Sequence, residues 1–440
     1  MFRIVALALA VSGLCPCSPV RADDDEDKAV ALLMKLGARV TRDTENRVVA
    51  VTLSGEQVKG AGRLKKLAPL QHLTELTLEG EELTDADLKD LAPHRNLTSL
   101  NLLGGRITDA GMKDLAPFTR LTKLNLSHTK LTGAGLENLI KFEHLTALDL
   151  SYTKVEDAGL KDLVELGRLT SLKLNNTKVT DAGVKDLAGL DNLKDLDLTE
   201  TALTSAGLKE VAALKGLTAL NLSQVKVTDT GLRNLAPLTA LQTLNLNRTK
   251  VTDAGLNSLS AFKALTWLDL SNTQVTGAGL KDLGLLAGLR WLNLNETQVT
   301  GTGLKDLAPL QKLEALKLNG TGVTNAGLKE LAPLQKNLAL LHLRQTQVTN
   351  GGLKDLAPFQ KIYELDLSNT AVTSAGLKEL AKLPGLRGLY LSGTQVTDAG
   401  LKELASLKSL RTLDLKGTKV TKGGAAGFQK AQPKCNVSGP

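Results

Sequence analysis

A repeat of about 24 residues constrains this chain more than any other feature of its sequence. One clear copy reads LTALDLSYTKVEDAGLKDLVELGR, from Leu145 to Arg168, and the next copy begins at Leu169. A fixed period of this length is typical of a solenoid, in which neighbouring repeats must stack because no repeat can bury its leucines alone. We therefore expect one elongated domain of stacked repeats, with binding rather than catalysis as its default activity.

Each repeat has a pattern that predicts one short strand followed by one short helix. Leu148 and Leu150 alternate with Asp149, which puts the two leucines on one face of a strand and the aspartate on the other. In the second half of a repeat, Thr180 is suited to cap the exposed amides of a helix, and Asp181 is suited to its positive end. Proline follows this segment in many copies and keeps the helix short.

A column of threonines marks the point where each strand must bend away from the sheet. A hydroxyl at this position can satisfy backbone groups of the turn, and Val225 interrupts the column once. The column consists of Thr129, Thr153, Thr177, Thr201, Thr249, Thr273, Thr297, Thr321, Thr346, Thr370, Thr394 and Thr418.

Threonine at this place in the L-x-x-L-x-L motif, followed by T-D-A-G-L-K, resembles secreted bacterial leucine-rich repeat proteins. It is also similar to the repeat class of F-box substrate receptors and, more loosely, of ribonuclease inhibitor. The resemblance covers nearly the whole chain after its N-terminal segment. It implies an α/β leucine-rich repeat solenoid, a right-handed superhelix or horseshoe with a parallel concave sheet and short convex helices. It names no partner, because the same solenoid serves unrelated ligands.

The N-terminus has the pattern of a secretory signal, with Arg3 before an apolar run and small residues before Asp23. The run is too short to span a membrane. We expect cleavage near Ala22 and export to the periplasm or the extracellular space. Cys435 is the cysteine that remains, in the C-terminal cap, with a reactive or dimer-forming thiol as the alternative. The expected segments are a signal peptide at 1–22, an N-terminal capping helix at 23–47, about sixteen repeats at 48–421 and a C-terminal cap at 422–440.

Charge and motif placement argue against several function classes. The net charge is +8, but a row of lysines and a row of acidic residues lie side by side along the expected helices, which indicates a solvated convex face. We therefore expect no nucleic-acid partner. The five histidines are scattered over different repeat positions, and no catalytic motif is present. We expect no enzyme activity, no metal and no cofactor, and the oligomeric state stays open.

The two tryptophans of the chain occupy the same concave position in adjacent repeats. Exposed, neighbouring indoles are typical of an interface hot spot or of a platform that stacks on sugars, although duplication of one repeat would also produce such a pair. Tyr152, Arg248 and Glu296, where the strands end, are candidates of second rank. The candidate partner-binding residues are Trp267, Trp291, Asp269, Asn293, Lys317, Leu340, His342 and Tyr390.

Two functions fit these features. The first is a non-enzymatic, exported protein–protein interaction module that binds a protein partner on its concave face. The second is a structural or glycan-contacting protein of the cell envelope, whose binding surface is distributed over the repeats. An inhibitor that wraps around an enzyme is a special case of the first function, and the sequence cannot separate the two.

Overall fold

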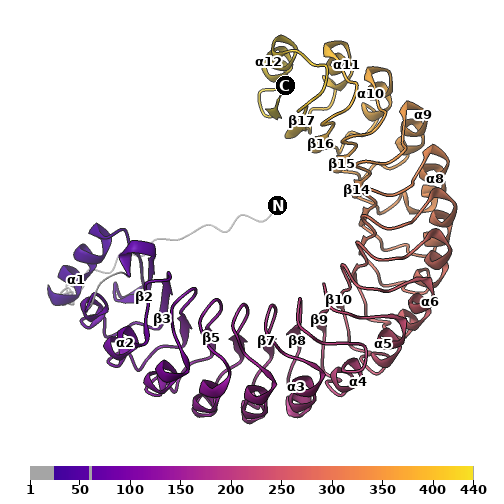
Figure 1. Ribbon diagram of the computed structural model, residues 1–440. Helices are drawn as coiled ribbons and strands as arrows, with labels where there is room; N and C mark the ends of the chain where they lie inside the picture. The colour runs from indigo at the N-terminus through magenta and orange to yellow at the C-terminus, as the bar shows by residue number, and fades with distance from the viewer. Residues whose placement is uncertain (1–23, 59–61, 440) are drawn as a thin grey trace, which may run out of the picture.

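A computed structural model describes residues 24–58 and 62–439, and it shows an open arc with helices along the outer edge and strands toward the inside (Figure 1). Within this part of the chain, 18 strands form one sheet. β1 pairs with β2 in antiparallel orientation, and each later strand pairs in parallel with the strand before it. The predicted parallel concave sheet with short convex helices is confirmed. The expected signal peptide, 1–22, lies outside the described residues.

The strands are short because each repeat contributes only the few residues that line the concave face. They are β1 (Arg39–Arg42), β2 (Val48–Ser54), β3 (Glu75–Glu79), β4 (Ser99–Asn101), β5 (Lys123–Asn125), β6 (Ala147–Asp149), β7 (Ser171–Lys173), β8 (Asp195–Asp197), β9 (Ala219–Asn221), β10 (Thr243–Asn245), β11 (Trp267–Asp269), β12 (Trp291–Asn293), β13 (Ala315–Lys317), β14 (Leu340–His342), β15 (Glu364–Asp366), β16 (Gly388–Tyr390), β17 (Thr412–Asp414) and β18 (Asn436–Ser438).

The convex segments are a mixture of short α-helices and 3-10 helices. The α-helices are α1 (Asp24–Lys35), α2 (Asp85–Leu88), α3 (Asp181–Asp186), α4 (Leu208–Val211), α5 (Asp229–Asn234), α6 (Asp253–Leu256), α7 (Leu280–Leu283), α8 (Asn325–Glu330), α9 (Asn350–Leu353), α10 (Leu377–Leu380), α11 (Asp398–Leu404) and α12 (Lys422–Ala431). The 3-10 helices are η1 (Gly55–Gln57), η2 (Leu64–Leu67), η3 (Lys89–Leu91), η4 (Asp109–Leu115), η5 (Ala134–Lys141), η6 (Asp157–Glu165), η7 (Leu187–Gly189), η8 (Asn257–Ala261), η9 (Gly277–Gly279), η10 (Gly301–Leu307), η11 (Ala332–Leu334), η12 (Lys354–Leu356) and η13 (Ser374–Gly376).

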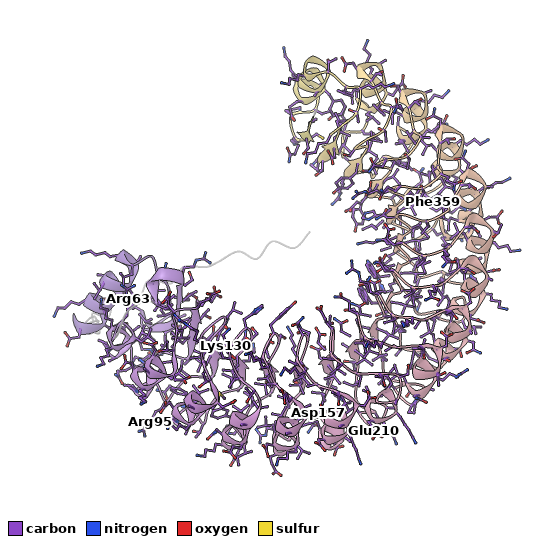
Figure 2. The ribbon with its side chains drawn as sticks, viewed as in Figure 1. Arg63, Arg95, Lys130, Asp157, Glu210 and Phe359 are labelled. Atoms are coloured by element: carbon purple, nitrogen blue, oxygen red, sulfur yellow. The ribbon has the colours of Figure 1, made fainter. Side chains whose placement is uncertain are left out.

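The core is a continuous layer between the sheet and the helices. Leu148 and Leu150 are buried in it, whereas Asp149 between them is partly exposed on the concave side, as the alternation predicts. A column of phenylalanines after the helices fills the same layer, and Figure 2 shows one of them, Phe359, within the thickness of the arc. Because each slice buries its leucines against the next, the core has no preferred centre.

Hydroxyl groups satisfy backbone groups in the turns that lead from the strands to the convex helices. The Thr153 hydroxyl donates to the carbonyl of Leu150 at 2.7 Å, which satisfies the turn locally as predicted. The Thr180 hydroxyl accepts from the N–H of Ala182 at 3.2 Å, which is the predicted cap of α3.

Different structures cover the two ends of the core. At the N-terminal end, α1 packs Leu33 into the core, and buried Glu26 accepts a hydrogen bond from the N–H of Val48 at 3.1 Å. β1 then adds an antiparallel edge strand, which the repeat pattern did not predict. At the C-terminal end, α12 buries Phe428, and β18 extends the parallel sheet by one more strand. Both caps protect leucines that a terminal repeat would otherwise expose.

Candidate binding site on the concave face

Trp267 and Trp291 lie opposite each other on the neighbouring strands β11 and β12. Their ring centroids are 4.4 Å apart and their planes differ by 6°, so the indoles stack face to face from one repeat to the next. The separation is close to the spacing of paired strands, about 4.8 Å, so the sheet itself brings the rings into contact. Each indole is partly exposed, and its outer face is turned toward a small residue, Thr243 on one side and Ala315 on the other.

Asp269 and Asn293 are buried next to the indoles, with exposed fractions of 9% and 8%. The amide nitrogen of Asn293 donates to a carboxylate oxygen of Asp269 at 2.9 Å, and the N–H of Ser271 donates to the other oxygen at 2.8 Å. The sequence suggested that these two side chains would contact a partner. The structure shows that they hydrogen-bond to each other between the strands that carry the indoles, and their contact with a partner stays a prediction.

Lys317 covers one end of the tryptophan stack. Its Nζ lies 5.2 Å from the ring centroid of Trp291, within the range of a cation–π interaction. The outer face of Trp267 is more open, because a hollow of about 200 Å³ lies in front of it. Trp267 and the small residues Ala219 and Thr243 line this hollow, together with the charged side chains of Lys173, Asp195 and Asp197.

The remaining candidates extend along the concave face away from the indoles. Leu340 pairs with Ala315, and His342 pairs with Lys317, so both lie close to the stack. The Nε2 atom of His342 is 2.8 Å from a carboxylate oxygen of Glu364. Tyr390 on β16 is four strands from Trp291, roughly 19 Å at the usual strand spacing. The structure therefore does not bring Tyr390 together with the tryptophans.

The environment of Tyr390 is acidic. Burial of its ring raises the pKa of the Tyr390 hydroxyl, and the carboxylates of Glu364, Asp366 and Asp414 raise it further. The phenol therefore stays protonated over an extended pH range and can donate a hydrogen bond. Among the residues described, none of the clusters of histidine, cysteine and carboxylate side chains has an arrangement that would hold a metal ion.

A second hollow lies at the edge of the sheet where the strands end, and sequence reasoning found only one of its residues. Its volume is about 650 Å³, and Tyr152 and His128 stack beside it with centroids 4.3 Å apart. A signal was present in the sequence, because His128 and Tyr152 each immediately precede a threonine of the column. Arg248 and Glu296, the other candidates of second rank, do not line it.

Cys435 directly precedes β18 and is buried, with 1% of its surface exposed. Burial raises the pKa of its thiol, and the positive charge of Arg411 opposes this effect without cancelling it. Within residues 24–58 and 62–439, no helix combines the length and the hydrophobicity needed to cross a lipid bilayer.

Comparison with known proteins agrees with this architecture. A family model for a leucine-rich repeat region matches residues 248–434, and a leucine-rich repeat model matches 94–116, 119–139, 143–164 and 169–188. None of the curated proteins matches the chain.

Solved structures share the fold at low sequence identity. A leucine-rich repeat protein of Leptospira interrogans is 23% identical, with a TM-score of 0.63, and the match covers 88% of this chain and 95% of that protein. An internalin from Listeria monocytogenes is 21% identical, with a TM-score of 0.50, and the match covers 89% of this chain and 94% of that protein. Repeat pattern, sheet and family models together show that this chain is a leucine-rich repeat protein.

Proposed function

We propose that this protein is an exported, non-enzymatic interaction module that binds a protein partner on its concave face, with Trp267 and Trp291 at the centre of the contact. Leucine-rich repeat proteins are generally protein-interaction modules, and their fold is typically a non-enzymatic scaffold. The proposal depends above all on the tryptophan stack, because two partly exposed indoles on a concave surface are the residue type and placement that dominate binding energy at interfaces.

Packing within the solenoid does not explain the indoles. Ala219 and Ala315 occupy the same strand position in nearby repeats, so alanine suffices for the fold there. Each tryptophan exposes apolar surface to water in the free protein, and a partner that covers the pair removes this cost. Duplication of a repeat would account for the origin of the pair but not for this exposure.

The hollow in front of Trp267 suggests the chemistry of the partner. It combines an open indole face with two carboxylates, Asp195 and Asp197, and one ammonium group, Lys173. An arginine or lysine side chain of the partner fits this setting, because its cation can stack on the indole while the carboxylates balance its charge. We therefore propose a protein partner that inserts a basic side chain beside Trp267.

Site-specific photo-crosslinking tests the proposal. A photoreactive amino acid replaces Thr243 or Ala315, beside the indoles, or Lys329, on the convex helix α8, and the native envelope fraction is irradiated with each protein. We expect a crosslinked protein partner from the two concave positions and none from Lys329. Combining Trp267→Ala with Trp291→Ala should abolish the crosslink, whereas circular dichroism should remain unchanged. Equal crosslinking with and without the tryptophans would favour the distributed-surface function instead.

Export rests on the N-terminal pattern of the sequence and has its own test. Mass spectrometry of the protein recovered outside the cytoplasm should find a mature chain that begins near Asp23. An intact N-terminus, or recovery in the cytoplasm alone, would contradict export without affecting the concave binding site.

A further inference from the structure

The strands leave the concave face through turns that require left-handed backbone. In most repeats, the residue immediately before the column threonine has a positive φ, as at Asn176 (54°), Asn272 (56°) and Gly320 (66°). Glycine and asparagine suit this conformation, and larger side chains adopt it at a cost. His128 and Tyr152 adopt it nonetheless, with φ angles of 60° and 56°. Long polar side chains such as Arg248 and Glu296 adopt it as well, and His128 and Tyr152 place two aromatic rings at adjacent turns.

The aromatic pair is arranged as an accessible platform. The rings of His128 and Tyr152 are 4.3 Å apart with planes that differ by 9°, and 46% of Tyr152 is exposed. In the preceding repeat the equivalent turn residue is Gly104, which has no side chain to cover the outer face of His128. The hollow of about 650 Å³ opens here, and we call it the rim pocket. The residues that line it are Glu81, Leu103, Gly104, Arg106, His128, Thr129, Lys130, Tyr152, Thr153, Lys154 and Asn176.

Three basic side chains line the rim pocket, one from each of three consecutive repeats. Arg106 is paired with Glu82 at 3.3 Å. Lys130 and Lys154 are exposed and make no ion pair within the described residues. In the next repeat, Lys178 is neutralised by Glu156 at 2.7 Å and does not line the pocket. The pocket therefore offers two lysines without an ion pair next to the aromatic platform, together with the exposed carboxylate of Glu81. Figure 2 shows one of these lysines, Lys130, toward the inside of the arc.

Several backbone N–H groups of the rim pocket are not available to a ligand. The N–H groups of His128 and Tyr152 donate to the carbonyls of Ser151 and Asn175 in the following repeats, and those of Lys130 and Lys154 donate to Ile107 and Leu131 in the preceding ones. A peptide that bound as an added strand would need such groups free. Recognition must therefore use the ring faces and the charged side chains.

We propose that the rim pocket binds a short oligosaccharide that carries carboxylate groups. A sugar ring presents a flat face of C–H groups that stacks on an aromatic ring, and its carboxylates match Lys130 and Lys154. A short ligand with a few carboxylates suits these two lysines, whereas a nucleic acid would need a longer basic track. The column of basic residues does not continue beyond Lys154 as such a track, because Lys178 is ion-paired and Ala202 is uncharged. The site is separate from the tryptophan stack and does not depend on the function proposed above.

Isothermal titration calorimetry of the full chain with a galacturonic acid trimer tests this assignment, with a neutral galactose trimer as the comparison ligand. Each replacement residue already occupies the equivalent position in another repeat of this chain. Asn176 is the equivalent of Tyr152, and Gln274 is the equivalent of Lys154. We expect Tyr152→Asn to weaken binding of the acidic trimer about ten-fold. Lys154→Gln should weaken it as well and reduce its dependence on salt concentration.

Matched control variants lie in the same two columns outside the pocket. Gln224→Asn and Lys250→Gln should leave the affinity unchanged, and so should Trp267→Ala with Trp291→Ala. The proposal would be overturned if neither trimer gave a measurable heat of binding. It would also be overturned if the neutral trimer bound with equal affinity, or if Tyr152→Asn left the affinity for the acidic trimer unchanged. Binding of oligouridylate in preference to the acidic trimer would also overturn it and would assign the pocket to single-stranded RNA.

Discussion

The carboxylate of Asp157 bonds to Thr180 in the following repeat through both of its oxygens. Oδ1 accepts from the N–H of Thr180 at 2.7 Å, and Oδ2 accepts from its hydroxyl at 2.6 Å. Figure 2 shows Asp157 among the helices of the convex side. Asp181 makes the same pair of bonds to Thr204, and Asp253 to Thr276. Because each bond joins two repeats, this ladder holds the stack in register.

Loss of this carboxylate should weaken the stack. We expect Asp157→Ala to lower the free energy of unfolding by about 1–2 kcal/mol, because the partly buried N–H and hydroxyl of Thr180 lose their acceptor. Asp157→Asn should lower the free energy of unfolding much less, because an asparagine already fills this role elsewhere in the stack. Asn325 accepts from the N–H of Thr349 and donates to its hydroxyl, at 2.8 Å each. Chemical unfolding followed by circular dichroism measures both variants. Equal losses in the two variants would mean that charge, rather than hydrogen-bond geometry, stabilises the contact.

Gly183 should tolerate no side chain, because the same aspartate lies against it. A Cβ added there would lie 2.4 Å from Oδ1 and 2.9 Å from Cα of Asp157. We expect Gly183→Ala to lower the free energy of unfolding by about 1–3 kcal/mol through this overlap. Gly167→Ala is the matched control, because a Cβ there meets nothing within 4 Å, and its effect should stay within about 0.5 kcal/mol. Similar unfolding midpoints for the two variants would refute this account.

His94 should make stability depend on pH. It is 3% exposed, and its Nε2 has no hydrogen-bond partner among the described residues. Burial lowers the pKa of the imidazole below its ordinary value of 6.5, and a hydrogen bond with the backbone of Leu70 opposes this only partly. His94 therefore binds a proton more readily in the unfolded chain than in the folded protein. The contribution of neutral His94 to the free energy of unfolding is fully present above pH 6.5, and it is lost as the pH falls toward the lower pKa of the folded state.

Replacing His94 by phenylalanine should remove this effect, since Phe118 fills the equivalent place one repeat later. We expect His94→Phe to raise the free energy of unfolding by about 1 kcal/mol at neutral pH, because the unpaired buried nitrogen disappears. Urea unfolding on both sides of pH 6.5 should show a smaller loss of stability in the variant than in the wild type. An identical pH dependence in both proteins would show that His94 does not titrate on unfolding.

The thiol of Cys435 should be inert in the folded protein. Thiolate is the reactive form, and burial both raises the pKa of Cys435 and blocks access to its sulfur. We expect a thiol reagent to label Cys435 in the folded protein only as fast as the C-terminal cap opens, and to label it completely in denaturant. Rapid labelling of the native protein, or a disulfide-linked dimer, would instead support the reactive thiol that the sequence left open.

Several features of the binding surfaces followed from the sequence. The 24-residue spacing of Trp267 and Trp291 predicts that they share one column, and the structure places them opposite each other. Burial of Asp269 and Asn293 did not follow, because alternation along a strand tells which face a residue occupies and not how much its neighbours cover it. The charge pattern around Tyr152 was equally hidden, since the side chains that line the rim pocket come from separate repeats.

By itself, the sequence determined the repeating unit, the strand and helix within it and the direction in which the leucines point, because these depend on contacts between residues a few positions apart. Tertiary structure alone decided which groups meet across repeats: Asp157 with Thr180, His128 with Tyr152, and the edge strand β1 with β2. Such contacts join residues about one repeat apart or pair non-repetitive segments, so they depend on the register and spacing of the stacked strands. That register exists only once every slice has buried its leucines against the next.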